Sequence, residues 1–186
     1  MDAADIRTVI AAFVEAAKRA VDAEFEIVEV HGAHGYLIHQ FLSPLRNVRS
    51  DGYGGDRQGR MRFALEIVEA VRRATPPSMP LLFRVSAVDG RGGVWDIDDT
   101  VALSKALRER EVDVIDVSSG GISGNSPMPV VPKRPGYQVG FARRIKAEAS
   151  IPTAAVGLIT EPEQAERIVR ENSADIVLLA RADLSR

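Results

Sequence analysis

The chain has 186 residues, of which 45% are hydrophobic and 27% charged, with a formal net charge of −2 and no cysteine. That length predicts one domain with a sizeable buried core, and the ordinary composition excludes disorder, collagen or a coiled coil as a description of the whole chain. The charge gives no reason to expect a nucleic-acid partner, and the lack of cysteine excludes disulfides, thiolate metal sites and cysteine nucleophiles.

Helical and strand-like patterns alternate along the chain. Apolar residues recur at helical spacing over 6–21, which Asp2 or Asp5 could cap, and the β-branched run 25–30 follows as a strand. A polar, glycine-containing segment over 31–56 is predicted as a long loop. Beyond it, the expected helices are 60–73, 96–110, 139–149 and 160–171, and the expected strands are 81–85, 112–117, 151–156 and 175–180.

Strands separated by helical segments predict a parallel sheet joined by βαβ crossovers. The fold class is therefore α/β, a single domain over 1–186 with five parallel strands and intervening helices. No apolar run approaches the roughly 18 residues of a membrane span, and no signal-peptide pattern opens the chain. We therefore expect a cytoplasmic protein with no membrane partner.

Functional groups of a parallel α/β sheet gather at the carboxyl ends of its strands. Each expected strand delivers polar residues or glycine to that end, which indicates a single site. These residues are His31, His34 and Tyr36 after the first strand, Arg84 and Ser86 on the second, Ser118 and Ser119 after the third, Gly157 and Thr160 after the fourth, and Arg181 after the fifth.

The pair His31 and His34 allows three interpretations. As metal ligands the two would need further partners, for which His39 or Glu29 is nearest. As loop histidines with satisfied hydrogen bonds they would need no function. As neutral hydrogen-bond donors they would polarise a substrate carbonyl or hold an anion, and Tyr36 could add a hydroxyl.

Arg84 stands inside an apolar strand, where a charge needs a counter-charge or an anionic ligand. One interpretation is an ion pair with Asp113 or Asp116 of the next strand. The other is a cation held against an electron-rich cofactor ring.

Two further residues favour an anion site. Gly157 lies just before a helix start, where free N–H groups attract anions, and Arg181 offers a planar donor fork suited to phosphate. The alternative is a tight turn at Gly157 and a surface ion pair at Arg181.

Three motifs carry a family resemblance: Val30-His-Gly-Ala-His-Gly-Tyr-Leu-Ile-His-Gln-Phe-Leu-Ser-Pro44, Phe83-Arg-Val-Ser86 and Ala155-Val-Gly-Leu-Ile-Thr160. They closely resemble the old yellow enzyme family of FMN-dependent NAD(P)H oxidoreductases, in its thermophilic-like bacterial branch. The resemblance covers nearly the whole chain. It implies a TIM barrel that binds FMN at the carboxyl ends of its strands, takes NAD(P)H as reductant and reduces an activated alkene.

The resemblance also implies a role for each candidate residue. His31 and His34 would hydrogen-bond the electron-withdrawing oxygen of an α,β-unsaturated substrate, with Tyr36 nearby, so that hydride passes from the flavin to the alkene. Arg84 would stabilise negative charge at the N1/O2 edge of the flavin. The residues that would line the FMN phosphate are Gly157, Ala180 and Arg181.

The five expected strands match the fourth to eighth strands of the family barrel, so the first three βα units and the terminal helix are expected to be absent. An open sheet of this kind exposes both edges, so we expect a homo-oligomer or a complementary fragment as partner. A catalytically incomplete fragment that acts as a structural or oligomerising module is one alternative. A metal-dependent hydrolase using His31, His34 and His39 is another.

Two positions depart from the family pattern. Glu24 and Glu111 each stand between a helix and a strand, where the family commonly has glycine. The departure predicts left-handed backbone at both glutamates, which costs a residue other than glycine roughly 1 kcal/mol or more.

Overall fold

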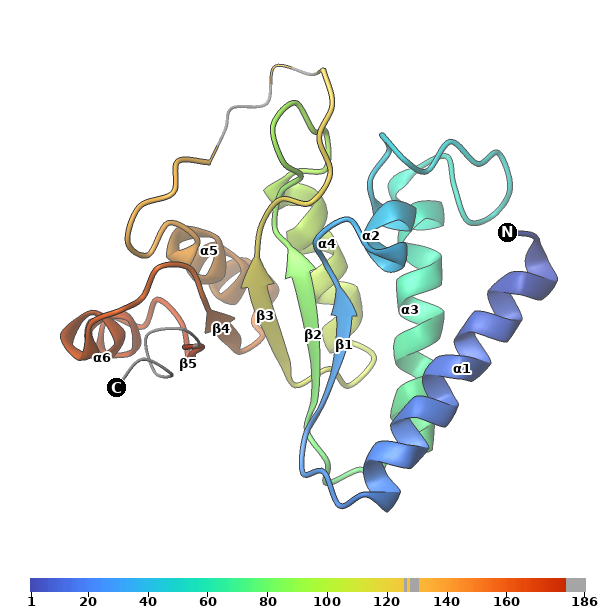
Figure 1. Cartoon of the computed structure of the whole chain (residues 1–186), viewed down its shortest axis with the longest axis horizontal. Helices are drawn as coiled ribbons and strands as arrows, with labels where there is room; N and C mark the ends of the chain where they lie inside the picture. The colour runs from blue at the N-terminus through green and yellow to red at the C-terminus, as the bar shows by residue number, and fades with distance from the viewer. Residues whose placement is uncertain (126, 128–130, 180–186) are drawn as a thin grey trace.

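The computed structural model describes residues 1–125, 127 and 131–179. Five strands form one parallel sheet in the order β1-β2-β3-β4-β5. In Figure 1 the arrows of β1, β2 and β3 point to the same end of the molecule, where long loops gather. The strands are β1 (Val28–Gly32), β2 (Leu81–Ser86), β3 (Val114–Ser118), β4 (Thr153–Ala155) and β5 (Ile176–Val177).

The helices alternate with these strands, as the sequence predicts. They are α1 (Ala3–Asp22), α2 (Leu37–Leu42), α3 (Arg57–Ala74), α4 (Ile97–Arg108), α5 (Val139–Ala149) and α6 (Pro162–Arg170). The carboxylates of Asp2, Asp56 and Asp96 accept backbone N–H groups where α1, α3 and α4 begin. Such caps stabilise a helix by about 1 kcal/mol each, so they determine where these helices start.

The ends of two helices confirm the predicted left-handed glutamates. Glu24 has φ 60° and Glu111 has φ 61°. After Glu24, the Phe25 N–H donates to the carbonyl of Ala20, a bond of the Schellman type. Because that bond holds Phe25 in the helix cap, β1 begins at Val28, three residues later than the sequence predicts.

The prediction of an uninterrupted loop over 31–56 is wrong at α2. This short helix buries Ile38, Phe41 and Leu42, which recur at helical spacing. Its N-cap, Tyr36, makes no side-chain capping hydrogen bond, and a glycine-containing segment precedes the helix. With six residues, α2 completes fewer than two helical turns, so its apolar spacing is too short to be recognised as a helix from the sequence.

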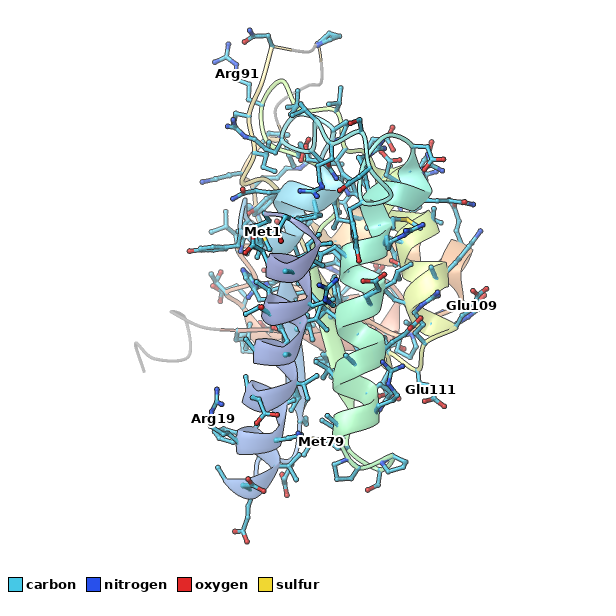
Figure 2. All side chains as sticks on the ribbon, turned by 90° about the vertical axis from the view of Figure 1, so that its right-hand side faces the viewer. Met1, Arg19, Met79, Arg91, Glu109 and Glu111 are labelled. Atoms are coloured by element: carbon cyan, nitrogen blue, oxygen red, sulfur yellow. The ribbon has the colours of Figure 1, made fainter. Side chains whose placement is uncertain are left out.

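The core lies between one face of the sheet and the helices. Buried apolar residues occupy alternate positions of β1, β2 and β3, namely Val30, Phe83, Val85, Ile115 and Val117, and they form one cluster with the apolar faces of α3 and α4. Figure 2 shows α1 and α3 side by side along the flank of the molecule, with Arg91 at the loop end and Met79 at the opposite end. None of the helices in the described part of the chain is long and apolar enough to cross a membrane.

Candidate active site

The register of the sheet places three charged or titratable side chains in a row. His31 of β1 pairs with Arg84 of β2, and Arg84 pairs with Asp116 of β3. Since alternate residues of a strand share a face, all three stand on the face opposite the buried apolar residues. Two residues further along, Ser86 pairs with Ser118 nearer the carboxyl ends. One face of the sheet is thus apolar and the other is polar.

A left-handed turn follows β1 and sets the position of His34. The turn is formed by His34 (φ 59°) and Gly35 (φ 78°). The His34 N–H donates to Ser86 Oγ at 3.0 Å, and Ser86 Oγ donates to the carbonyl of Gly120 at 2.7 Å. The ring of His34 points back to β3, with Nε2 2.6 Å from Ser118 Oγ.

The structure brings the three predicted catalytic side chains together. The ring centroids of His31 and His34 lie 5.2 Å apart, and the Tyr36 ring lies 5.4 Å from that of His31. Both histidines are half-buried, whereas the Tyr36 side chain is exposed. The cluster therefore has a protected side formed by the imidazoles and an open side formed by the tyrosine.

The surroundings of both imidazoles favour the neutral form. Burial, followed by the positive charge of Arg84, lowers the pKa of His34 to about 4. The same two causes, in the same order, lower the pKa of His31 from its usual 6.5. A neutral imidazole carries one N–H donor and one acceptor nitrogen, so the pair can polarise a carbonyl oxygen without bringing a full charge.

Arg84 has its counter-charge in Asp116. Arg84 Nε lies 3.0 Å from Asp116 Oδ2, whereas Asp113 Oδ2 accepts the Leu81 N–H at 2.8 Å. Asp116 is fully buried, and that burial raises its pKa to about 7 against the lowering effect of Arg84, while nearby Glu29 raises it further. The guanidinium of Arg84 is a permanent cation, and Asp116 balances its charge only when that carboxyl is ionised.

A pocket of about 290 Å³ opens beside Arg84 at the carboxyl ends of β3 and β4. Gly157 lies in its wall with φ 119°, and a Cβ there would approach Gln138 Nε2 to 2.7 Å. Only glycine meets both the backbone and the space requirements at this position. Other lining residues are Ser118, Lys133, Tyr137, Thr160, Val156 and Leu178.

Gln138 is a site residue to which the sequence assigns no role. Its Nε2 donates to the carbonyl of Val156 at 2.9 Å, and its Oε1 accepts from Ser119 Oγ at 2.6 Å. The side chain is buried and ties the loop after β3 to the end of β4. The family resemblance extends through Pro135-Gly-Tyr-Gln138, and that motif is the sequence signal that could have indicated it.

Two of the predicted phosphate-binding residues, Ala180 and Arg181, lie outside the described residues. The other five predicted residues are placed at the carboxyl edge of the sheet. His31, His34 and Tyr36 form one cluster, Arg84 stands beside His31 in the register, and Gly157 shares the pocket with Arg84.

His39 does not join the histidine pair as a metal ligand. Its Nδ1 accepts the Gly35 N–H at 2.9 Å, and its Nε2 lies 2.9 Å from Asp89 Oδ1. Among residues 1–125, 127 and 131–179, no group of three or more His, Cys, Asp or Glu side chains could hold a metal ion. The described residues thus give no geometric support to the metal interpretation.

The donor set of the pocket fits an anionic cofactor with an aromatic ring. Arg84 and Lys133 supply positive charge, and Gly157 allows a ligand to approach the backbone closely. Val156 and Leu178 supply apolar contact in the same wall. A flavin mononucleotide combines these features, since it has a ring and a phosphate.

Known proteins are similar to this sequence over nearly its whole length. The family model of the NADH:flavin oxidoreductase / NADH oxidase family matches residues 1–186. The NADPH dehydrogenase of Geobacillus sp. (strain WCH70) is 49% identical over 185 residues, which cover 97% of this chain and 52% of that protein. The NADPH dehydrogenase of Clostridium acetobutylicum is 46% identical over 177 residues, 95% of this chain and 51% of that protein. The chain thus spans about half the length of these relatives.

Solved structures show the same partial coverage. Histamine dehydrogenase from Rhizobium sp. 4-9 aligns with a TM-score of 0.82 at 31% identity, over 97% of this chain and 26% of that chain. Morphinone reductase in complex with tetrahydroNAD aligns with a TM-score of 0.72 at 25% identity, over 97% of this chain and 46% of that chain. The predicted partial TIM barrel of five parallel strands is confirmed. The chain belongs to the NADH:flavin oxidoreductase / NADH oxidase family, the old yellow enzyme family, which implies FMN as cofactor and NAD(P)H as reductant.

Proposed function

We propose that this chain is the substrate-polarising part of an FMN-dependent NAD(P)H oxidoreductase of the ene-reductase type. The observation that carries the proposal is the pair of imidazoles, His31 and His34, whose lowered pKa values favour the neutral form. Their ring centroids lie 5.2 Å apart at the carboxyl end of the polar sheet face. Two N–H donors so close together suit one oxygen of an α,β-unsaturated substrate. The cation Arg84 and the pocket beside it supply the neighbouring cofactor site.

The histidines act by binding charge that develops on the substrate oxygen. As hydride reaches the β-carbon, electron density moves to that oxygen, and fixed N–H donors bind the resulting anion more strongly than the ground state. Ser118 engages Nε2 of His34, so Nδ1 is the nitrogen that the described contacts leave for a substrate. Nδ1 carries the proton when the Ser118 hydroxyl donates to Nε2 at 2.6 Å rather than to Gln138 Oε1 at 3.4 Å.

Other residues hold the cofactor and balance its charge. FMN, when bound, supplies the hydride that NAD(P)H has delivered to it. Arg84 offers a permanent cation that stabilises negative charge on the flavin ring, and Gly157 lets the phosphate approach the backbone. The family pattern adds Ala180 and Arg181 at the phosphate.

The experiment is a titration of the purified chain with FMN, followed by flavin fluorescence and absorbance. We expect saturable quenching that Arg84→Ala weakens about 10- to 100-fold, as the loss of one charged contact would. Arg73→Ala is the control, because Arg73 is an exposed arginine on α3. With FMN bound, NADPH oxidation is then measured with 2-cyclohexenone as a simple α,β-unsaturated acceptor. Absence of quenching in every variant, also with the rest of a relative's barrel added, would contradict the proposal.

A second proposal, an incomplete fragment that acts as a structural or oligomerising module, draws on the free edge of β1. In the described sheet β1 pairs only with β2. Beside it lies an apolar groove of about 390 Å³, where Phe25 and Ile27 are 63% and 54% exposed. An edge strand beside exposed apolar side chains favours a homo-oligomer or a complementary fragment. FMN binding only after the remaining barrel segment of a relative is added would show that this chain alone is incomplete, and size-exclusion chromatography reports the oligomer.

A further inference from the structure

We infer that buried His39 is a positioning residue, which holds the turn that presents His34 to the substrate. The inference rests on the proposed role of His34 but concerns a different side chain. His39 is fully buried on α2 and touches neither the pocket beside Arg84 nor the His31 ring. Its contacts connect the turn at residues 34–35 to the loop after β2.

The tautomer of His39 follows from its two hydrogen bonds. The Gly35 N–H donates to His39 Nδ1 at 2.9 Å, so Nδ1 carries no proton. The proton is therefore on Nε2, which donates to Asp89 Oδ1 at 2.9 Å. Because the ring is fully buried, water has no access to replace either bond.

Asp89 is itself held by several donors. Its Oδ2 accepts from Ser43 Oγ at 2.8 Å and from the N–H groups of Trp95 and Val94 at 3.0 and 3.1 Å. Burial alone raises the pKa of Asp89, but the hydrogen bonds from His39, Trp95 and Ser43 together bring it below its usual value. An ionised and fully bonded Asp89 fixes the position of the His39 ring.

The turn needs such support because its backbone is unfavourable. His34 is a residue other than glycine at φ 59°, and a Cβ on Gly35 would come within 2.5 Å of the Gly121 carbonyl oxygen. Two consecutive N–H groups of this turn are each bound by a buried side chain, His34 N–H by Ser86 and Gly35 N–H by His39. Loss of the second bond removes the buried acceptor of the Gly35 N–H, and we expect the turn and the His34 ring that it carries to become more mobile.

Two variants separate the two bonds of His39. The Oδ1 of an asparagine stands at the same distance along the side chain as histidine Nδ1, so His39→Asn keeps an acceptor for Gly35 and loses the contact with Asp89. The Nε2 of a glutamine corresponds to histidine Nε2, so His39→Gln keeps the donor to Asp89 and loses the acceptor. If His39 served folding alone, His39→Gln would preserve the wild-type behaviour at least as well as His39→Asn. If His39 positions the turn, only His39→Asn preserves it, because only asparagine keeps the acceptor for the Gly35 N–H.

The readouts are taken on the cofactor-free protein by NMR. In the unmodified chain, the ring ¹⁵N shifts of His39 should report the Nε2–H tautomer. His39→Asn should keep slow exchange of the Gly35 amide and the ring shifts of His34. His39→Gln should speed that exchange about tenfold or more and move the His34 shifts toward those of a free imidazole. The control is Gln40→Ala, which removes an exposed bond to the Gly35 carbonyl and should change neither readout.

Two outcomes would overturn the inference. One is an Nδ1–H tautomer in the unmodified chain, a measurement that does not depend on any variant folding. The other is wild-type exchange and His34 shifts in His39→Gln. No readout uses FMN or an alkene, so the positioning role can hold even where the FMN titration fails. Equally, FMN can bind in a chain where His39 proves not to position the turn.

Discussion

The two faces of the sheet are made by the same strands but carry different side chains. Toward the helices, Phe83 and Ile115 are fully buried among apolar neighbours. On the other face, Arg84 and Asp116 stand one residue further along and carry charge. Consecutive residues of a strand point to opposite faces of the sheet. Neighbouring residues therefore serve different purposes: one packs in the core that stabilises the fold, and the next belongs to the candidate site.

The largest difference between the faces should appear in the unfolding free energy when two neighbouring residues of β2 are truncated. We expect Phe83→Ala to cost about 3–5 kcal/mol of unfolding free energy, because it empties a fully buried position. Leu82→Ala, on the half-buried polar face, should cost less than about 2 kcal/mol. Urea unfolding followed by the fluorescence of Trp95, the single tryptophan, measures both. Equal losses would mean that the polar face contributes as much packing as the apolar one.

A second test concerns the buried carboxyl of the polar face. The pKa of Asp116 is raised to about 7, so between its unfolded value near 3.8 and pH 7 the folded state binds more protons than the unfolded state. Stability therefore falls as pH rises through this window, by up to about 4 kcal/mol for about three pKa units.

Asp116→Asn removes the part of this dependence that belongs to Asp116, while the raised pKa of Glu29 leaves a part of its own. We expect the variant to match the parent near pH 4 and to be more stable at pH 8, with the gain measured by urea unfolding at both pH values. A loss of stability at pH 8 would show instead that the ionised pair with Arg84 is favourable overall.

A third test concerns the charge of the histidine pair. With its pKa lowered to about 4, His34 should remain neutral down to pH 5, and its ring protons should titrate by NMR with a midpoint near 4. His31 should titrate below its usual 6.5 as well. A midpoint of 6.5 for His34 would mean that burial and the charge of Arg84 do not lower its pKa in the folded chain.

The smallest effect lies away from both faces, at a helix end. Glu111 has φ 61°, so Glu111→Gly should stabilise the chain by about 1 kcal/mol through relief of left-handed strain. Glu109, also labelled in Figure 2, caps the same helix in right-handed geometry, and Glu109→Gly should give no gain. Thermal unfolding compares the two, and an equal response would reject strain as the cause.

Much of the fold was predictable from the sequence, because segments with helical and strand-like spacing of apolar residues alternate along the chain. The helix 139–149 is confirmed at both ends, and of the two candidate caps Asp2 and Asp5 the structure shows Asp2 at the start of α1. The strand boundaries were less predictable, because hydrogen bonds outside the local pattern decide them. For instance, the carboxylate of Asp175, just before β5, accepts the N–H of Thr153, the first residue of the neighbouring strand β4.

The candidate site was predictable only in part. Strand ends and the family resemblance indicated His31, His34 and Arg84, but the choice of Asp116 over Asp113 as the partner of Arg84 depends on which face each aspartate occupies. The bond between His39 and Asp89 joins residues fifty positions apart. No local pattern predicts such a contact, since it arises only when α2 folds against the loop after β2.

The most direct test of the two-face description is to map FMN on the protein by NMR. Amide shifts are recorded on the ¹⁵N-labelled chain during an FMN titration. The description predicts changes at Arg84, Ser118 and Gly157, with the amides of the buried helix face, such as Ile67 on α3, unaffected. Changes centred on the apolar groove at Phe25, or none at any FMN concentration, would contradict it.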